Sequence, residues 1–128
     1  MSERVLSQRE LNRALLARQL LLERGRMSVP KALERIGGIQ AQYAPAMYLG
    51  LWSRVESLER AALTRALERR WVIQATLMRA TIHLVSRADY WPLTAAIRAE
   101  RRAWWERTHN KQADPVQARA AGKRLRAF

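Results

Sequence analysis

The chain has 128 residues, of which 24 are lysine or arginine and 11 are aspartate or glutamate, so its formal charge is +13. This length is typical of one domain, or of one small domain with part of a second. The absence of cysteine excludes a disulfide framework, a cysteine-ligated metal site and a thiol nucleophile, and two histidines are too few for a standard metal site. No apolar run is long enough to span a bilayer and no signal-peptide core is visible, so the sequence predicts a cytoplasmic location.

The excess of positive charge favours a polyanionic partner. A strongly basic surface attracts DNA, RNA or an acidic membrane face, and the second half of the sequence carries the larger share of the charge. Arginine greatly outnumbers lysine, and its planar guanidinium group suits bidentate contacts with phosphate. A GC-rich genome would also favour arginine over lysine, but it would not account for the net charge.

The first predicted helix begins at a capping box, in which Ser7 caps the helix and the Glu10 side chain bonds back to the cap. Leucine and alanine then recur at helical spacing, which predicts one apolar face. The pattern continues to a predicted stop at Gly25, because glycine is common just beyond the end of a helix.

Three further helices are predicted after this one. Ser28 caps a short helix that ends before Gly37 and Gly38. Pro45 opens the next helix, and residues 56–70 have the periodicity of another amphipathic helix. The segment between Gly38 and Pro45 is therefore expected to be a loop or an extended chain.

The periodicity then changes from helical to strand-like. Residues 71–77 and 81–85 are rich in β-branched side chains and are separated by three residues, which predicts an antiparallel hairpin. Ser86 and Asp89 form a second capping box, with aspartate in place of glutamate, and open a helix that extends to about Arg107.

Helices followed by a small hairpin are the order of a winged helix-turn-helix, so the sequence predicts a mainly α fold with a small β-hairpin. Asp114 and Pro115 then open a last helix. We expect a first winged-helix domain over residues 1–86. Residues 87–128 are expected to be the helices that begin a second, incomplete winged-helix unit of a tandem array.

Gln40 and Gln42 flank Ala41 in the segment that is expected to be extended. Side chains two residues apart on an extended chain point the same way, so the two carboxamides are expected to converge. Each has a carbonyl acceptor and an NH₂ donor, which suffice to hold a water molecule or the edge of a base. The alternative is that both glutamines are merely solvated, as is common in polar loops.

Arg79, Thr81 and His83 alternate along the predicted hairpin and would share one face of it. In a functional interpretation Arg79 binds phosphate and the other two residues assist. In a structural interpretation only Arg79 is exposed to water. The pattern favours the structural role for Thr81 and leaves both roles open for His83.

Basic side chains are frequent in the two predicted helices that follow the hairpin. In the first of them arginines alternate with Trp104 and Trp105, a pattern typical of contact with nucleic acid or a membrane surface, although packing of the tryptophans in a core is an equal alternative. The basic end of the chain would follow phosphates without reading sequence. The candidate DNA-binding residues of these helices are Arg101, Arg102, Arg119, Lys123, Arg124 and Arg126.

No phosphate-binding loop, dinucleotide fingerprint, hydrolase triad or paired-carboxylate site is visible, and no cofactor or metal is predicted. Four blocks, LNRALLARQLLLERG, VPKALERIGGIQAQYAP, GLWSRV and ATLMRATIHLVSRADYW, occur in unbroken order over roughly residues 7–95. In these blocks the chain resembles the N-terminal part of one bacterial family, the winged-helix DNA-binding proteins of the AlkZ-like DNA glycosylase type.

This resemblance implies a function and a site. The family combines tandem winged helices with a C-terminal β-barrel around a basic DNA channel, and it hydrolyses the N-glycosidic bond of alkylated or crosslinked purines. Its catalytic signature is Gln-aliphatic-Gln, with Asp in the last position in a related branch, and it matches Gln40, Ala41 and Gln42 here. The resemblance implies that both glutamines act jointly on water and the transition state, and that the partner is duplex DNA, alkylated or crosslinked, in the nucleoid.

Members of the family are longer, so the resemblance implies that this chain stops inside the second winged helix. The leading hypothesis is the N-terminal part of a DNA glycosylase. The alternative is a non-catalytic winged-helix module that binds DNA in a regulatory or architectural role, and a third hypothesis, an RNA- or membrane-binding protein, rests on charge alone. Loss of Gln40 and Gln42 distinguishes the first two hypotheses. It should abolish excision if the chain is part of a glycosylase, and it should barely change DNA binding if the chain is a non-catalytic module.

Overall fold

The computed structural model describes residues 4–109 of the chain. These residues divide into two compact units, the first ending at Thr94 and the second beginning at Ala95, and each unit is described by itself. The helix predicted to begin at Asp114 and Pro115 lies outside the described residues.

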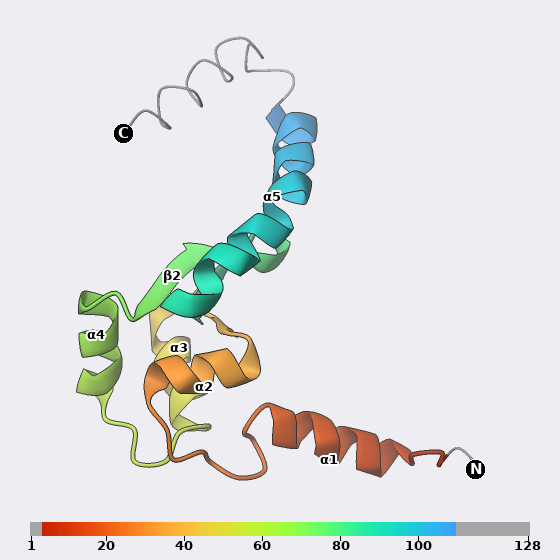
Figure 1. The fold of residues 1–128 in the computed structure, drawn as a ribbon, viewed down its shortest axis with the longest axis vertical. Helices are drawn as coiled ribbons and strands as arrows, with labels where there is room; N and C mark the ends of the chain where they lie inside the picture. Colours follow the sequence, from red (N-terminus) through yellow and green to blue (C-terminus); the bar gives the residue numbers. More distant parts are fainter. Residues whose placement is uncertain (1–3, 110–128) are drawn as a thin grey trace. The chain divides into compact units, whose positions relative to one another are not determined.

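The first unit contains short helices and a small antiparallel sheet of three strands (Figure 1). In chain order the elements are α1 (Gln8–Arg18), α2 (Val29–Ile36), β1 (Ile39–Gln40), α3 (Ala44–Trp52), α4 (Arg60–Glu68), β2 (Val72–Thr76), the 3-10 turn η1 (Met78–Ala80), β3 (Ile82–Ser86) and α5 (Arg87–His109). The prediction of a mainly helical chain with a small antiparallel β-structure is confirmed. The part of α5 that begins at Ala95 belongs to the second unit.

The sheet has the strand order β1-β3-β2, with β3 in the centre. The predicted hairpin is formed by β2 and β3, which pair antiparallel with Val72 opposite Ser86 at one end. β1 adds a short strand on the other side of β3 and places Gln40 opposite His83. The extended conformation predicted for Gln40 is confirmed, and pairing with β3 is what the structure adds to it.

The core of the first unit lies between the sheet and three of the helices. α2 packs against β3 and α4, α4 packs against β2, and α3 packs against β1. The buried side chains of this core are Val29, Leu33, Ala41, Met47, Leu51, Leu63, Ala66, Val72 and Leu84. Each large apolar side chain removed from water stabilises the unit by roughly 1.5–3 kcal/mol. Three helices on a small antiparallel sheet are consistent with a winged helix.

The first helix ends earlier than the sequence predicts. α1 stops at Arg18 and does not continue to Gly25, because Leu20 adopts a left-handed conformation with φ 56°. Leu21 then donates its N–H to the carbonyl of Leu16 at 2.9 Å, the bond that closes a Schellman motif. The side chain of Leu20 is buried, and this burial favours a conformation that a leucine otherwise rarely adopts.

The apolar face predicted for α1 is not buried in the described part of the chain. No residue of this helix is buried, and Leu11 and Leu15 are 43% and 59% exposed. The amphipathic pattern was therefore right about the helix and wrong about an inward face within residues 4–109.

The fourth helix starts later than predicted, at Arg60 and not at the beginning of residues 56–70. The chain before it is used for a short parallel bridge between Gly25 and Val55. In this bridge Glu56 donates its N–H to the carbonyl of Gly25 at 3.0 Å. Gly25, which was predicted to end the first helix, thus pairs with a segment 30 residues away. Because the Glu56 N–H is used in this pairing, Glu56 lies outside α4.

The capping box predicted at Ser7 is confirmed, and at Ser86 one of the two bonds of the predicted box, that from the Asp89 N–H to the serine hydroxyl, is present. The Ser7 side chain accepts from the N–H of Glu10, whose carboxylate accepts from the N–H of Ser7. Asp89 donates its N–H to the Ser86 hydroxyl at 3.1 Å, and its carboxylate accepts from that hydroxyl at 2.9 Å, whereas Glu10 accepts from the backbone N–H of its cap. These bonds satisfy N–H groups that the first turn of a helix leaves open.

Within residues 4–109 no helix, α5 included, is both long and apolar enough to cross a membrane.

Candidate functional site

The glutamine motif lies where β1 ends. Gln40 is the last residue of the strand and is exposed, Ala41 is 1% exposed, and Gln42 is exposed again. Ala41 belongs to the core, so the alternation of an extended chain directs the side chains on either side of it away from the core. This burial pattern agrees with the alternation expected from the sequence, and the catalytic role of the pair stays a prediction.

Two side-chain amides take over the backbone hydrogen bonds at this point of the sheet. Ala41 donates its N–H to the carbonyl of Ile82 at 2.8 Å, as in an antiparallel pair. In place of the return bond, Ile82 donates its N–H to Oε1 of Gln42 at 3.1 Å. The carbonyl of Ala41 accepts from Nε2 of Gln74, also at 3.1 Å. The backbone groups are therefore satisfied, and Gln42 is held by the carbonyl end of its carboxamide.

Gln74 is a site residue that the sequence does not single out. It lies on β2, which is separated from β1 by the central strand, and 33 positions from Ala41 in the chain. The available signal was a long polar side chain in the middle of a strand whose neighbours are mostly apolar. That signal gives no partner, because the contact depends on the order of the strands.

A glycine allows β1 to approach β3. Gly38 has φ +90°, and a Cβ at this position would lie 2.9 Å from the carbonyl oxygen of Leu84 and 2.7 Å from Cγ1 of Val85. Both distances are too short for any side chain to be accommodated without movement of the central strand. The neighbouring Gly37 also has a positive φ, +76°, but it faces open space. Gly38 is therefore the position at which the motif-bearing strand is fitted to the sheet.

Arg79, Thr81 and His83 were predicted to share one face of the hairpin. Arg79 does not lie on that face. It lies in η1 with φ 53°, because the tight turn reverses the chain there, so the strand alternation does not extend to it. His83 is only 6% exposed, and its Nδ1 lies 3.0 Å from the carbonyl oxygen of Thr81, to which it donates when it carries the proton. This burial favours a structural role for His83, while the exposed Arg79 stays a candidate for phosphate contact. Within residues 4–109 no group of His, Asp and Glu side chains is arranged to hold a metal ion.

The basic helix predicted after the hairpin is α5, and Arg101 and Arg102 lie in its second-unit part. Both are exposed, and Arg102 forms an ion pair with Glu106 at 2.9 Å. Trp104 and Trp105 are 48% and 39% exposed. A DNA-binding role for this stretch stays a prediction. The remaining candidates, Arg119, Lys123, Arg124 and Arg126, lie outside the described residues.

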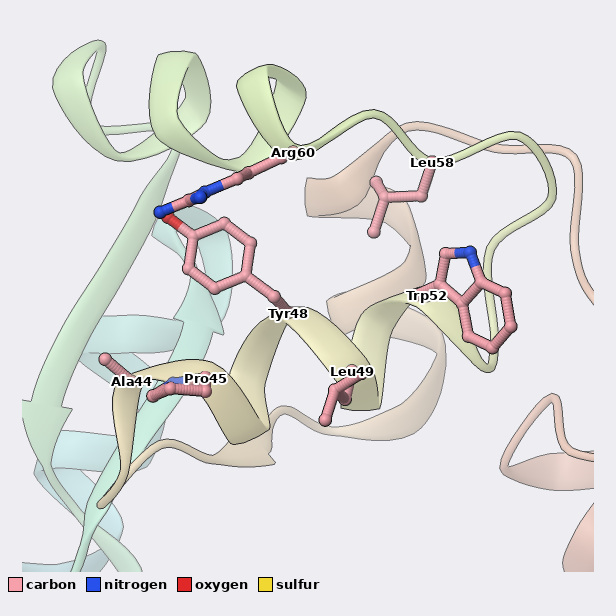
Figure 2. Close-up of a pocket in the computed structure, with 7 residues that line it drawn as sticks. All are labelled: Ala44, Pro45, Tyr48, Leu49, Trp52, Leu58 and Arg60. Carbon is pink, nitrogen blue, oxygen red and sulfur yellow. The ribbon is translucent and has the colours of Figure 1, made fainter.

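An apolar groove of about 630 Å³ lies between α3 and α4 (Figure 2). Its lining residues are Ala44, Pro45, Tyr48, Leu49, Trp52, Leu58 and Arg60. The guanidinium of Arg60 lies over the ring of Tyr48 at 5.5 Å, and that of Arg24 lies over Trp52 at 4.1 Å. Such cation–π contacts hold exposed aromatic rings in place. None of the lining residues belongs to the glutamine motif.

The sequence model of the family described as DNA glycosylase AlkZ-like matches residues 33–128, about three quarters of the chain. The matched range includes the whole sheet and both glutamines of the motif. The chain belongs to the AlkZ-like DNA glycosylase family.

Among solved structures, the DNA glycosylase AlkZ from Streptomyces sahachiroi is similar to this chain, with a TM-score of 0.59 and 22% sequence identity. The match covers 84% of this chain and 27% of the other, so the chain spans about a quarter of the length of that protein. At this identity the likeness is one of fold. No curated protein matches the chain.

Proposed function

We propose that this chain carries the catalytic motif of a DNA glycosylase that hydrolyses the N-glycosidic bond of alkylated or crosslinked purines. The observation that carries the proposal is the position of Gln40 and Gln42, which are exposed on either side of a buried Ala41 in a member of the AlkZ-like family. Duplex DNA is the proposed partner, and the net charge of +13 suits its phosphates.

The reaction does not require a strong acid. A purine alkylated at N7 or N3 is already cationic, so it leaves as a neutral base when the bond between C1′ and its nitrogen breaks and the electron pair goes to the base. C1′ gains oxocarbenium character and bonds to a water oxygen, and the proton of that water passes to the solvent. Amide dipoles that orient the water and face the developing positive charge provide the catalysis expected here.

The two glutamines supply these dipoles in the proposed mechanism. The hydrogen bond from Ile82 fixes the carboxamide of Gln42 through one lone pair of Oε1, and the second lone pair is the one proposed to act on the water, so the group does not need to reorganise during the reaction. Gln40 lies on the paired part of β1, opposite His83, which defines its backbone position. We assign water placement and transition-state stabilisation to the pair jointly.

A single incubation tests the proposal. The 128-residue chain, its Gln40→Ala/Gln42→Ala variant and a control variant, Gln8→Ala/Gln19→Ala, are incubated with duplex DNA that contains N7-methylguanine. Abasic sites are counted after alkaline cleavage, and the bound fraction is measured by fluorescence anisotropy. We expect excision to fall at least about 100-fold in the motif variant only, with the bound fraction unchanged. Excision that survives in the motif variant would overturn the proposal.

DNA binding without catalysis is the second candidate function. The helix pair α3–α4 followed by a hairpin fits a winged helix-turn-helix, in which the second helix enters the major groove. α4 and the residue after it present exposed arginines, Arg60, Arg65 and Arg69. In this case the chain binds duplex DNA and releases no base, and its DNA affinity does not change when Gln40 and Gln42 are lost.

The second winged-helix unit proposed over residues 87–128, which would make a tandem array, is compatible with either function.

The basic end of the chain is proposed to bind phosphates. An Arg119→Ala/Arg124→Ala/Arg126→Ala variant should bind duplex DNA more weakly without a change in sequence preference. Because each phosphate contact contributes about 0.9 to the slope of log K against log salt concentration, the slope should become shallower by roughly 3. An unchanged affinity would contradict this part of the proposal.

A further inference from the structure

We infer that Gln74 is a positioning residue of the glutamine site, which determines the orientation of the Gln42 carboxamide through the backbone between them. The positioning is a property of the fold, and its consequence for excision rests on the proposed function.

Ile82 has one N–H and two competing acceptors. The carbonyl of Ala41 is its regular antiparallel partner, because Ala41 already donates its own N–H to Ile82 at 2.8 Å. The second acceptor is Oε1 of Gln42, and this is the one that Ile82 uses, at 3.1 Å. The choice between the two acceptors therefore decides whether the Gln42 side chain is anchored or released.

Gln74 occupies the acceptor that Ile82 does not use. Its Nε2 donates to the carbonyl of Ala41 at 3.1 Å. Gln74 stands opposite Leu84 on the central strand, and Leu84 stands opposite Ile39 on β1, so the side chain spans the width of the sheet toward the segment that follows β1. A neutral amide with two N–H donors suits this position, whereas a carboxylate there would repel the carbonyl.

Removal of the Gln74 donor releases the carbonyl of Ala41 from its bond across the sheet, and this carbonyl can then turn toward the Ile82 N–H. The ordinary antiparallel bond from Ile82 to Ala41 can then form, and the ladder between β1 and β3 lengthens by one bond. The Gln42 carboxamide loses its anchor and samples several rotamers. Misplacement of a catalytic group by about 1 Å can cost about 100-fold in rate.

Scalar couplings across hydrogen bonds distinguish the two acceptors directly. In the uniformly ¹³C,¹⁵N-labelled chain, we expect a coupling between the Ile82 backbone nitrogen and Cδ of Gln42. In Gln74→Met this coupling should vanish and one to the carbonyl carbon of Ala41 should appear, while the control Gln19→Met keeps the wild-type pattern. A coupling to Gln42 that persists in Gln74→Met would overturn the inference.

A second variant covers the case in which Gln74→Met does not fold. Gln74→Glu is expected to lose the Gln42 coupling at pH 7, where the carboxylate has no donor. It should regain the coupling near pH 3.5, where most of an ordinary glutamic acid side chain is protonated and can donate. The same coupling pattern at both pH values would also overturn the inference.

Excision provides the functional readout. Gln74→Met is expected to lower the single-turnover rate by about 10- to 100-fold at an unchanged bound fraction, whereas Gln19→Met is not. If couplings shift but the rate does not, the catalytic consequence is overturned. If instead Gln40→Ala/Gln42→Ala excises like the wild type, the proposed function fails, and the couplings alone decide whether Gln74 positions Gln42.

Discussion

The end of β1 and the groove between α3 and α4 belong to the same unit, yet they hold their side chains in opposite ways. At the end of β1 the carboxamides of Gln42 and Gln74 are fixed by directional bonds to backbone groups. In the groove, the ring of Trp52 lies beneath the guanidinium of Arg24 and against apolar surface, which impose little direction. The groove is thus not where the family motif lies.

The largest expected effect comes from the glycine that fits β1 to the sheet. Gly38→Ala should lower the free energy of unfolding by about 2–4 kcal/mol, because the new Cβ meets the Leu84 carbonyl and the backbone is left-handed. Gly37→Ala shares the positive φ but meets no neighbour, and should cost about 1 kcal/mol. Urea unfolding of both variants measures the difference. Equal losses would mean that the close approach of β1 to β3 contributes nothing.

A smaller effect separates the two glutamines from each other. Gln42→Ala removes the acceptor of the Ile82 N–H and should destabilise the unit by about 0.5–1.5 kcal/mol. Gln40→Ala truncates an exposed side chain and should change stability by less than about 0.5 kcal/mol. Both are read from urea midpoints at constant m-value. A Gln40→Ala variant that is the less stable of the two would contradict the assignment of the anchored role to Gln42.

The groove should respond still more weakly. A double-mutant cycle with Arg24→Met and Trp52→Leu isolates the contact between the guanidinium and the indole ring. We expect a coupling of about 0.5–1 kcal/mol, as is usual for exposed cation–π pairs. The same cycle on Gln8 and Asn12, a hydrogen-bonded pair on exposed α1, gives the reference for a surface contact. A coupling indistinguishable from zero would show that the guanidinium of Arg24 does not help to hold the Trp52 ring.

The capping box of α1 is a further directional contact, and its expected effect is a shift in a titration midpoint. The backbone N–H of Ser7, the Ser7 hydroxyl and Arg4 all bond to the carboxylate of Glu10 and hold its pKa below the ordinary value of 4.5. A lowered folded pKa means that the stabilisation is complete above pH 4.5 and is lost as the pH falls through the folded pKa. NMR titration of Glu10 Cδ should show a midpoint below 4.5, and Ser7→Ala should raise it. A wild-type midpoint at or above 4.5 would show that the bonds from Ser7 and Arg4 do not lower the pKa of Glu10.

Local rules made much of the fold predictable. The capping box at Ser7 and the bonds between Ser86 and Asp89 depend on residues three positions apart, so the sequence contains all that is needed to place them. Gly37 ends α2 because a left-handed residue is easiest for glycine. The hairpin and the alternation around Ala41 follow from a period of two.

Features that depend on distant contacts were not predictable in this way. α1 ends where Leu20 is buried beside Ala32 and Val55, which a periodic pattern does not reveal. In the candidate site, the positions of Gln40 and Gln42 follow from the sequence, but the bond from Ile82 to Gln42 and that from Gln74 to Ala41 require the strand order β1-β3-β2. A polar residue on one strand has no identifiable partner until the neighbouring strands are known.

The exposed leucines of α1 have a consequence for the colloidal behaviour of the chain. Copies that each carry a charge of +13 repel one another, and this repulsion opposes contact between their apolar helix faces. Salt shortens the range of the repulsion, from about 10 Å at 0.1 M to about 3 Å at 1 M ionic strength. The ionic conditions that release DNA from a basic surface therefore also remove the repulsion that keeps these exposed leucines of different copies apart.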